Sequence, residues 1–194
     1  MLYLHPYISF ATVDLNHYNL WVDKMRADGY PVKNQKSAFG TGLGLGYKAN
    51  LVDVGISFAI LYSSSTSGWN PTNGVYSERT HSPLNFLMNV PVGLNYPLSD
   101  QFSVLVAFKP IFGYSRIITR IWQVSDASLS STSFGLGFEM GGDFSFSRSV
   151  SLALSFGYDA INFKRYEGEK EERCSDGTYR KKVAFFVFDK ENIR

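Results

Sequence analysis

Glycines stand at every second position of the stretch FGTGLGLGYK, residues 39–48. A phosphate-binding loop needs its glycines between a strand and the start of a helix, where free backbone N–H groups meet the anion. Here the residues that follow, 52–62, alternate strictly between large apolar side chains and mostly smaller or polar ones, which is typical of a strand. The P-loop Lys-Ser/Thr signature is also absent. We therefore predict a strand with one apolar face and one nearly bare face.

Length, charge and cysteine content narrow the class of protein. The chain has 194 residues, enough for one domain, which we place at 1–194. Its net charge of +2 gives no strong field that would attract nucleic acid. Cys174 is the single cysteine, so an internal disulfide framework is excluded. No run of about 18 apolar residues is present, so we expect no transmembrane helix.

Strand-like segments recur, and the connections between them alternate in length. The predicted strands are 2–14, 37–49, 52–63, 84–96, 102–118, 132–146, 150–163 and 179–188. The first long connection holds a predicted short helix at 20–26, residues 119–131 are a long excursion or an extension of the flanking hairpin, and 164–178 are a charged loop. All short turns then lie at one end and all long loops at the other, which is typical of an up-and-down outer-membrane barrel.

The two faces of each strand decide between a membrane barrel and a soluble barrel or sandwich. In 102–118 one face carries Phe and Val, whereas the other includes Ser103, Ala107 and Gly113. Gly and Ala on a water-facing surface would weaken the strand without gain, but the interior of an eight-stranded barrel is just wide enough for side chains, so many of them must be small. We therefore predict an all-β fold, an eight-stranded antiparallel up-and-down transmembrane β-barrel with short periplasmic turns and long external loops.

Aromatic residues mark both ends of the apolar faces. The residues are Tyr47, Tyr96, Phe102 and Phe144 toward the short turns, and Tyr62, Tyr114 and Tyr158 toward the long loops. Amphipathic rings prefer the two membrane–water interfaces. We expect these seven side chains to form two aromatic girdles.

The chain resembles the small eight-stranded outer-membrane barrels of Gram-negative bacteria, of the OmpA/OmpX and opacity-protein type. YKANLVDVGISF and NYPLSDQFSVLVAF look like the strand-turn-strand hairpins of that family. The resemblance covers essentially the whole chain and implies a bacterial outer-membrane location, a mostly closed interior, a monomer, and contact with outer-membrane lipid or lipopolysaccharide.

The C-terminus departs from the family pattern, and the N-terminus bears on where the chain is located. Such barrels end in an aromatic residue that the assembly machinery reads, whereas this chain ends VAFFVFDKENIR, where Phe188 is the nearest match. The start, MLYLHPYISF, lacks the charged region and apolar core of a signal peptide, so either a signal has been removed or the chain stays in the cytoplasm.

Charged residues on the bare faces are predicted to point into the lumen. These are Asp53, Lys109, Glu139 and Asp159, with Arg180 or Lys182 as further candidates. Charges inside a narrow barrel must be paired, because desolvation is costly. They are expected to form a static plug or, alternatively, a gate in which Lys109 changes partners and opens a narrow pore.

Other polar and aromatic residues give weaker functional signals. His5, His17 and His81 are scattered and Cys174 is remote, so we expect neither a metal nor another cofactor. His81 and Ser82 stand near the external end of a strand, where lipid A deacylases of this architecture use such a pair, with Glu78 as a guess for the orienting acid. Three tryptophans in the long loops are candidates for partner contacts or for interfacial anchoring: Trp21, Trp69 and Trp122.

These patterns predict a non-enzymatic protein with a structural or interaction role, namely membrane integrity, adhesion, or binding of an extracellular ligand or host surface through the external loops. A narrow porin-like channel is the alternative, and a lipid A-modifying enzyme is a third.

Overall fold

The computed structural model describes residues 1–12, 23, 26–27, 37–62, 65–67, 79–121, 125–147, 149–163, 165–174 and 176–187. For residues 65–67, 79–83, 119–121, 125–127, 172 and 184–187 it describes the backbone alone. No helix in these parts of the chain is long and apolar enough to cross a membrane. The predicted helix at 20–26 lies outside the described residues except for Asp23 and Arg26, which are helical.

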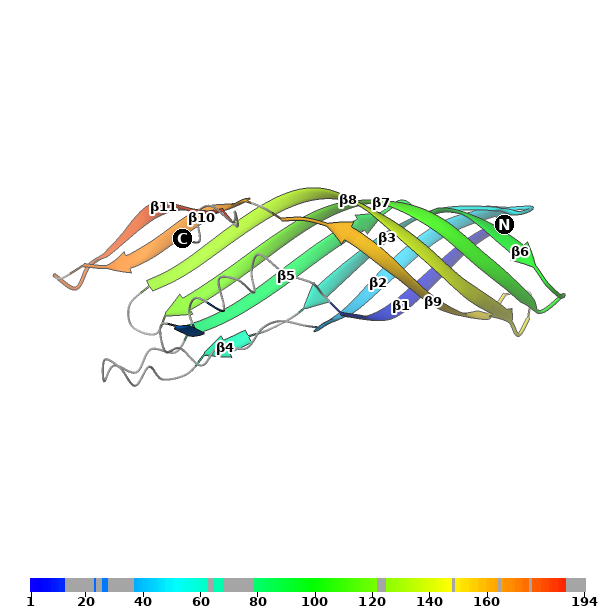
Figure 1. The fold of residues 1–194 in the computed structure, drawn as a ribbon, viewed down its shortest axis with the longest axis horizontal. Coiled ribbons are helices and arrows are strands. Elements are labelled where there is room, and N and C mark those ends of the chain that lie inside the picture. Colours follow the sequence, from blue (N-terminus) through cyan, green and yellow to red (C-terminus); the bar gives the residue numbers. More distant parts are fainter. Residues whose placement is uncertain are drawn as a thin grey trace.

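The described strands form one antiparallel sheet, which Figure 1 shows rolled into a barrel with β9 crossing in front of β1 and β2. The strands are β1 (Leu2–Thr12), β2 (Ser37–Ala49), β3 (Val52–Tyr62), β4 (Ser65–Ser67), β5 (Arg79–Asn89), β6 (Val92–Pro97), β7 (Phe102–Ile121), β8 (Ser125–Ser145), β9 (Ser151–Ile161), β10 (Arg165–Arg173) and β11 (Tyr179–Val187). Their order in the sheet is β1-β2-β3-β5-β7-β8-β10-β11, with β4 beside β5, β6 between β3 and β7, and β9 beside β8. The predicted all-β antiparallel barrel is confirmed.

The predicted strand 84–96 appears as two pieces, β5 and β6, separated at Val90 and Pro91. Proline has no N–H to donate, so the regular ladder is interrupted there. The backbone of Val90 still donates to Pro110 O over 3.0 Å, and Gly55 N donates to Pro91 O over 2.9 Å. The two pieces therefore act as one spanning strand with a local irregularity.

The prediction of a charged loop at 164–178 is wrong for most of that segment. Residues 165–173 form β10, which pairs with β8 and with β11. Continued backbone pairing satisfies the peptide groups, and ion pairs such as Lys181 to Glu169 (3.5 Å) accommodate the charges on an exposed ribbon. High charge here indicated an exposed segment, and that exposed segment is a hairpin.

β7 and β8 are much longer than a membrane crossing requires. They contain 20 and 21 residues, whereas a tilted strand crosses the hydrocarbon layer with about 9–11. The predicted excursion at 119–131 is therefore largely the extension of this hairpin, which was one of the two alternatives. Figure 1 shows this extension and the β10–β11 hairpin on the side of the molecule away from the N-terminus.

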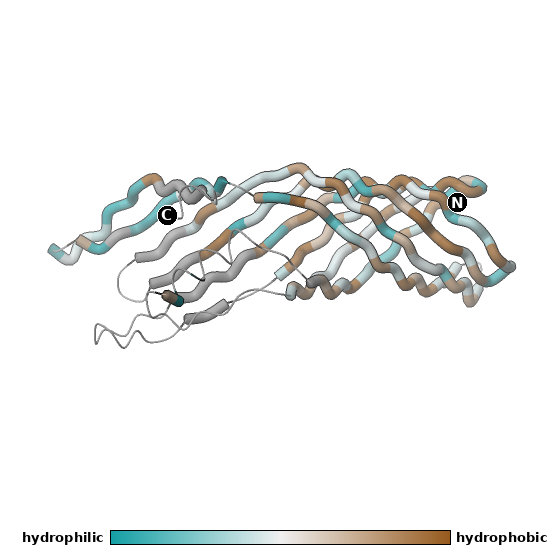
Figure 2. Tube along the Cα trace, viewed as in Figure 1, coloured by the Kyte–Doolittle hydropathy of each residue, from teal (hydrophilic) through white to brown (hydrophobic). Residues whose placement is uncertain are grey.

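The faces of the strands point as predicted. In β3 the residues Asp53, Ser57 and Ala59 are buried, while the intervening Val54, Phe58 and their neighbours are exposed. Figure 2 shows that apolar residues concentrate in the half of the barrel with the short turns, and that the β10–β11 hairpin is mainly hydrophilic. The apolar side chains thus form an outward belt suited to lipid.

The bare face of β2 lies under three rings from β1. The cross-strand partners are Tyr3 and Gly46, His5 and Gly44, and Tyr7 and Gly42. A Cβ atom on any of these glycines would overlap its partner's ring. The rings also stack along β1, with the His5 centroid 5.6 Å from that of Tyr3 and 5.6 Å from that of Tyr7. The glycines therefore make room for bulk from the neighbouring strand inside a narrow barrel.

β9 is exposed along nearly its whole length on both faces. Within the described residues it pairs with β8, and β1 pairs with β2, with no further partner described for either. The number of strands that close the barrel around the membrane belt is therefore not fixed by these residues, and eight stays a prediction.

Candidate functional site

The interior of the barrel is filled by a layer of apolar side chains. Ala59 from β3, Leu87 from β5 and Ile111 from β7 are buried, and Ile111 is 0% exposed. Three partly buried residues pack against this layer: Tyr7, Leu61 and Ile161. These come from β1, β3 and β9, so the layer joins inward side chains of five strands.

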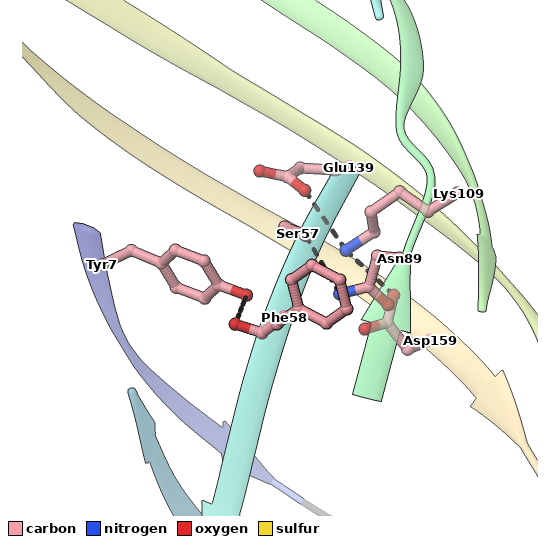
Figure 3. Close-up of polar contacts among 7 residues, drawn as sticks. All are labelled: Tyr7, Ser57, Phe58, Asn89, Lys109, Glu139 and Asp159. Carbon is pink, nitrogen blue, oxygen red and sulfur yellow. Dashed lines mark hydrogen bonds and ion pairs between the residues drawn. The ribbon is translucent and has the colours of Figure 1, made fainter. Parts of the chain in front are cut away.

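Lys109 lies one inward position before Ile111 on β7 and makes two ion pairs. Its Nζ is 3.2 Å from Glu139 Oε2 and 3.0 Å from Asp159 Oδ1, as Figure 3 shows. Gly137 stands between Lys109 and Asp159 in the register, and a Cβ there would overlap the Asp159 carboxylate. Glycine at 137 thus lets one ammonium group reach carboxylates from β8 and β9.

Three of the four predicted lumen charges are brought together, and Asp53 is not among them. Tyr3 donates its phenol hydroxyl to Asp53 Oδ1 over 2.5 Å. No described cation pairs with Asp53. The predicted network is therefore two separate groups: a Lys109–Glu139–Asp159 ion triad, and a Tyr3–Asp53 pair nearer the short-turn end.

Uncharged polar groups extend the ion triad into a polar layer. Asn89 Nδ2 donates to Ser57 Oγ over 3.4 Å, and the Tyr7 hydroxyl donates to Phe58 O over 3.4 Å. Figure 3 places these four residues beside the triad. This polar layer can form hydrogen bonds, but the apolar layer lies directly next to it.

Several inward residues were missed from the sequence. The inward row of Tyr3, His5 and Tyr7 on β1 could have been predicted, because the alternating glycines of β2 leave space that large side chains of a neighbouring strand must fill. Tyr166 carried none, because it falls in the segment expected to be a loop. Its hydroxyl donates to Ser115 Oγ over 2.9 Å, and both side chains are buried. Tyr166 therefore helps to fill the lumen toward the external end.

The seven predicted girdle residues all lie on the outward face. At the short-turn end Phe102 and Phe144 are direct cross-strand partners. On β7 the outward residue after Tyr114 is the exposed Arg116, which interrupts the apolar series before Ile118. The outward face of β8 changes in the same place, from Phe134 to the hydroxyl residue Thr132, the partner of Tyr114. This change marks the external edge of the belt.

The remaining predicted residues are only partly covered by the structure. Trp21, Trp69, Trp122, His17 and Glu78 lie outside the described residues. His81 and Ser82 lie on β5, with backbone alone described, where His81 pairs with Ser65 and with Thr119. Among the described residues, no group of three or more His, Cys, Asp or Glu is placed to hold a metal ion.

Comparison with known proteins agrees with this architecture. The family model of the outer membrane protein beta-barrel domain matches residues 4–183. Comparison with curated proteins and with solved structures gave no match. The matched region runs from the first residues of β1 into β11 and covers most of the chain. The chain therefore belongs to the outer membrane protein beta-barrel domain family, and is an outer-membrane barrel protein.

Proposed function

We propose that this outer-membrane barrel has a structural and interaction role, in which a closed lumen supports an external β-extension that binds an extracellular ligand or host surface. The protein is a monomer in this proposal and carries out no catalysis. It holds its position in the membrane through the outward belt.

The apolar layer is the observation that carries the proposal. An ion entering the lumen would have to leave water and pass Ile111, Leu87 and Ala59, which offer it no hydrogen bond. Next to this layer Lys109 is held by two carboxylates at once, so its charge is already compensated. Both features favour a plug over a permanent pore.

The length of β7 and β8 supports the interaction role. About ten residues of each strand extend past the length needed for the membrane. β10 and β11 add a second hairpin, which carries exposed charged residues such as Glu167 and Lys181. The exposed aromatic residue Tyr179 lies on the same hairpin. Rigid ribbons of this kind present side chains outside the cell at little entropic cost.

Planar-bilayer recording separates this proposal from the narrow-channel alternative. Wild-type protein is expected to give no conductance steps, and Ile111→Gly, which removes the centre of the apolar layer, is expected to give small ones. Thr41→Gly, on the outward face of β2, is the matched control and should stay silent. Regular steps from the wild type that disappear in Lys109→Met would establish the channel instead.

A shortened extension tests the binding role. Ile117 and Leu129 are cross-strand partners, so 118–128 are replaced by an Asn-Gly turn. The variant is expected to fold and insert, while expressing bacteria lose adhesion to an epithelial-cell layer. Unchanged adhesion of the shortened variant would refute the proposed role of this extension.

A further inference from the structure

Two aspartates at the short-turn end of the lumen lack a cationic partner among the described residues. Asp53 on β3 is 9% exposed, and the Oδ1 atom of Asp143 on β8 is buried. Lys48 is the direct cross-strand partner of Asp53, but no ion pair joins the two side chains. A carboxylate that leaves water costs free energy unless an opposite charge or hydrogen bonds compensate it.

The inward charges of β1–β9 show the same imbalance for the lumen as a whole. Where side chains are described, four carboxylates and two ammonium groups point inward, namely Asp53, Glu139, Asp143 and Asp159 against Lys48 and Lys109. Lys109 already pairs with Glu139 and Asp159. This part of the lumen therefore carries an excess of two negative charges, and its two unpaired carboxylates lie at the short-turn end.

The strand register brings further oxygen atoms beside these two aspartates. Tyr3 on β1 reaches Asp53 two strands away, so side chains at this level span the narrow lumen. The charges of Asp53 and Asp143 both act on the Tyr3 phenol. Ser103 on β7 is the direct partner of Asp143, and Asn95 on β6 lies one inward position from the partner of Asp53. The five side chains thus converge on one level of the barrel.

Asn95 gives an independent indication of a ligand at this level. The residue points inward and is 3% exposed, yet its Oδ1 atom has no hydrogen-bond partner among the described residues. Buried polar atoms in proteins nearly always have a partner, so this oxygen is available to a bound group. An amide oxygen beside two carboxylates attracts a cation and repels an anion.

The chemistry of these atoms favours Ca²⁺. This ion takes six to eight oxygen ligands from carboxylates, amide carbonyls and water, whereas Mg²⁺ keeps more of its water and Zn²⁺ prefers nitrogen and sulfur. Its two positive charges equal the excess of negative charge in the lumen. The expectation of no metal rested on the scattered His residues and Cys174, which this set of oxygen atoms does not use. The set holds only two carboxylates, so it differs from a cluster of three or more His, Cys, Asp or Glu.

We propose that Asp53, Asp143 and the Oδ1 atom of Asn95 bind a Ca²⁺ ion at the short-turn end of the lumen, with Ser103 as a further ligand. Tyr3 donates to Oδ1 of Asp53, so it orients that carboxylate and leaves Oδ2 for the ion. The ion joins β3, β6 and β8 on the short-turn side of the ion triad. The inference goes beyond the proposed function, because it does not depend on what the external hairpins bind.

Calorimetric titration with Ca²⁺ tests this site in the refolded full chain, freed of metal with EDTA in neutral detergent. The wild type is expected to bind one ion per chain with a dissociation constant of about 10⁻⁴–10⁻³ M, the weak range of calcium sites. Asp143→Asn should weaken binding about tenfold, because it removes one charged ligand. Asn95→Asp adds a charge to the ligand set and should bind more tightly, which an asparagine with a purely structural role would not predict.

Asp159→Asn is the matched control, because it removes an inward carboxylate from the ion triad and leaves the proposed ligands in place. It should bind Ca²⁺ as the wild type does. An equal loss of affinity in Asp159→Asn and Asp143→Asn would mean that the ion responds to the general charge of the lumen and would overturn the site.

Three other results would also overturn the inference. They are a wild type that binds no Ca²⁺ at millimolar concentration, wild-type affinity in Asp143→Asn, and displacement of Ca²⁺ by Na⁺ at equal concentration, which would indicate a nonspecific counterion. Each variant is first checked for its shift on unboiled SDS gels. If Asp143→Asn does not fold, Asp53→Asn takes its place, and wild-type affinity there also rejects the site.

Discussion

The imidazole ring of His5 lies over Gly44, its direct partner across β1 and β2. The three atoms nearest to a Cβ built on Gly44 all belong to that ring. Tyr7 over Gly42 and Tyr3 over Gly46 repeat the relationship on either side. The alternating glycines of β2 and the inward rings of β1 are therefore one packing unit, and neither strand can be changed independently.

Replacing Gly44 is expected to destabilise the barrel through this unit. Gly44→Ala places a methyl group against His5 and should lower the free energy of unfolding in lipid vesicles by about 1–3 kcal/mol, the usual cost of overpacking. Urea titration measures this. His5→Ala should recover much of the loss in the double variant, and Thr41→Ala on the outward face is the control. No recovery in the double variant would mean that the ring is not the obstacle.

Lys109→Met is expected to destabilise the lumen, because it leaves Glu139 and Asp159 as adjacent unpaired carboxylates. Removing one partner of a buried ion pair costs about 3–5 kcal/mol, and the loss here should be lower because the Asp159 side chain is 35% exposed. The triple variant with Glu139→Gln and Asp159→Asn should restore most of the stability, as urea titration would reveal. A triple variant no more stable than Lys109→Met would contradict the triad.

The overall architecture follows from the sequence because strand periodicity and barrel geometry depend on local patterns. Alternation assigned the outward and inward faces of β2, β3 and β7 correctly, since one side of each strand must meet lipid. The pairing of Lys109 with Glu139 and Asp159 was also among the expected contacts, because few cations point inward.

Features that depend on neighbouring strands were harder to predict from the sequence. Asp53 was grouped with Lys109 because both point inward, but the register places Tyr3 where it reaches Asp53 first. Tyr166 was assigned to a loop because charged residues surround it, and charge does not distinguish a loop from a solvent-exposed ribbon. The break at Pro91 was not predicted, because the alternation of side chains continues through it. Alternation alone carries no information about a missing backbone N–H.

His81→Ala is expected to leave the lipid A of expressing cells unchanged, because the proposed role includes no catalysis. The mass spectrum of lipid A from cells with the variant should match that from cells with the wild type and from cells with an empty vector. Ser82→Ala serves as a second variant. An acyl-chain loss that appears with the wild type and vanishes with His81→Ala would instead establish the enzyme.

Depth in the membrane should determine the cost of a charge on the outward face. Phe108 is 50% exposed in the middle of the belt, between Val92 and Phe138 in the register, whereas Tyr96 is 60% exposed at the end of β6. An arginine costs about 2–4 kcal/mol at the bilayer midplane and about 0–1 kcal/mol near an interface. Phe108→Arg should therefore lose far more unfolding free energy in vesicles than Tyr96→Arg. Both losses should be small in detergent micelles, which deform around the charge. Equal losses for the two variants in vesicles would show that the aromatic face does not meet lipid, and that the assignment of the two faces is wrong.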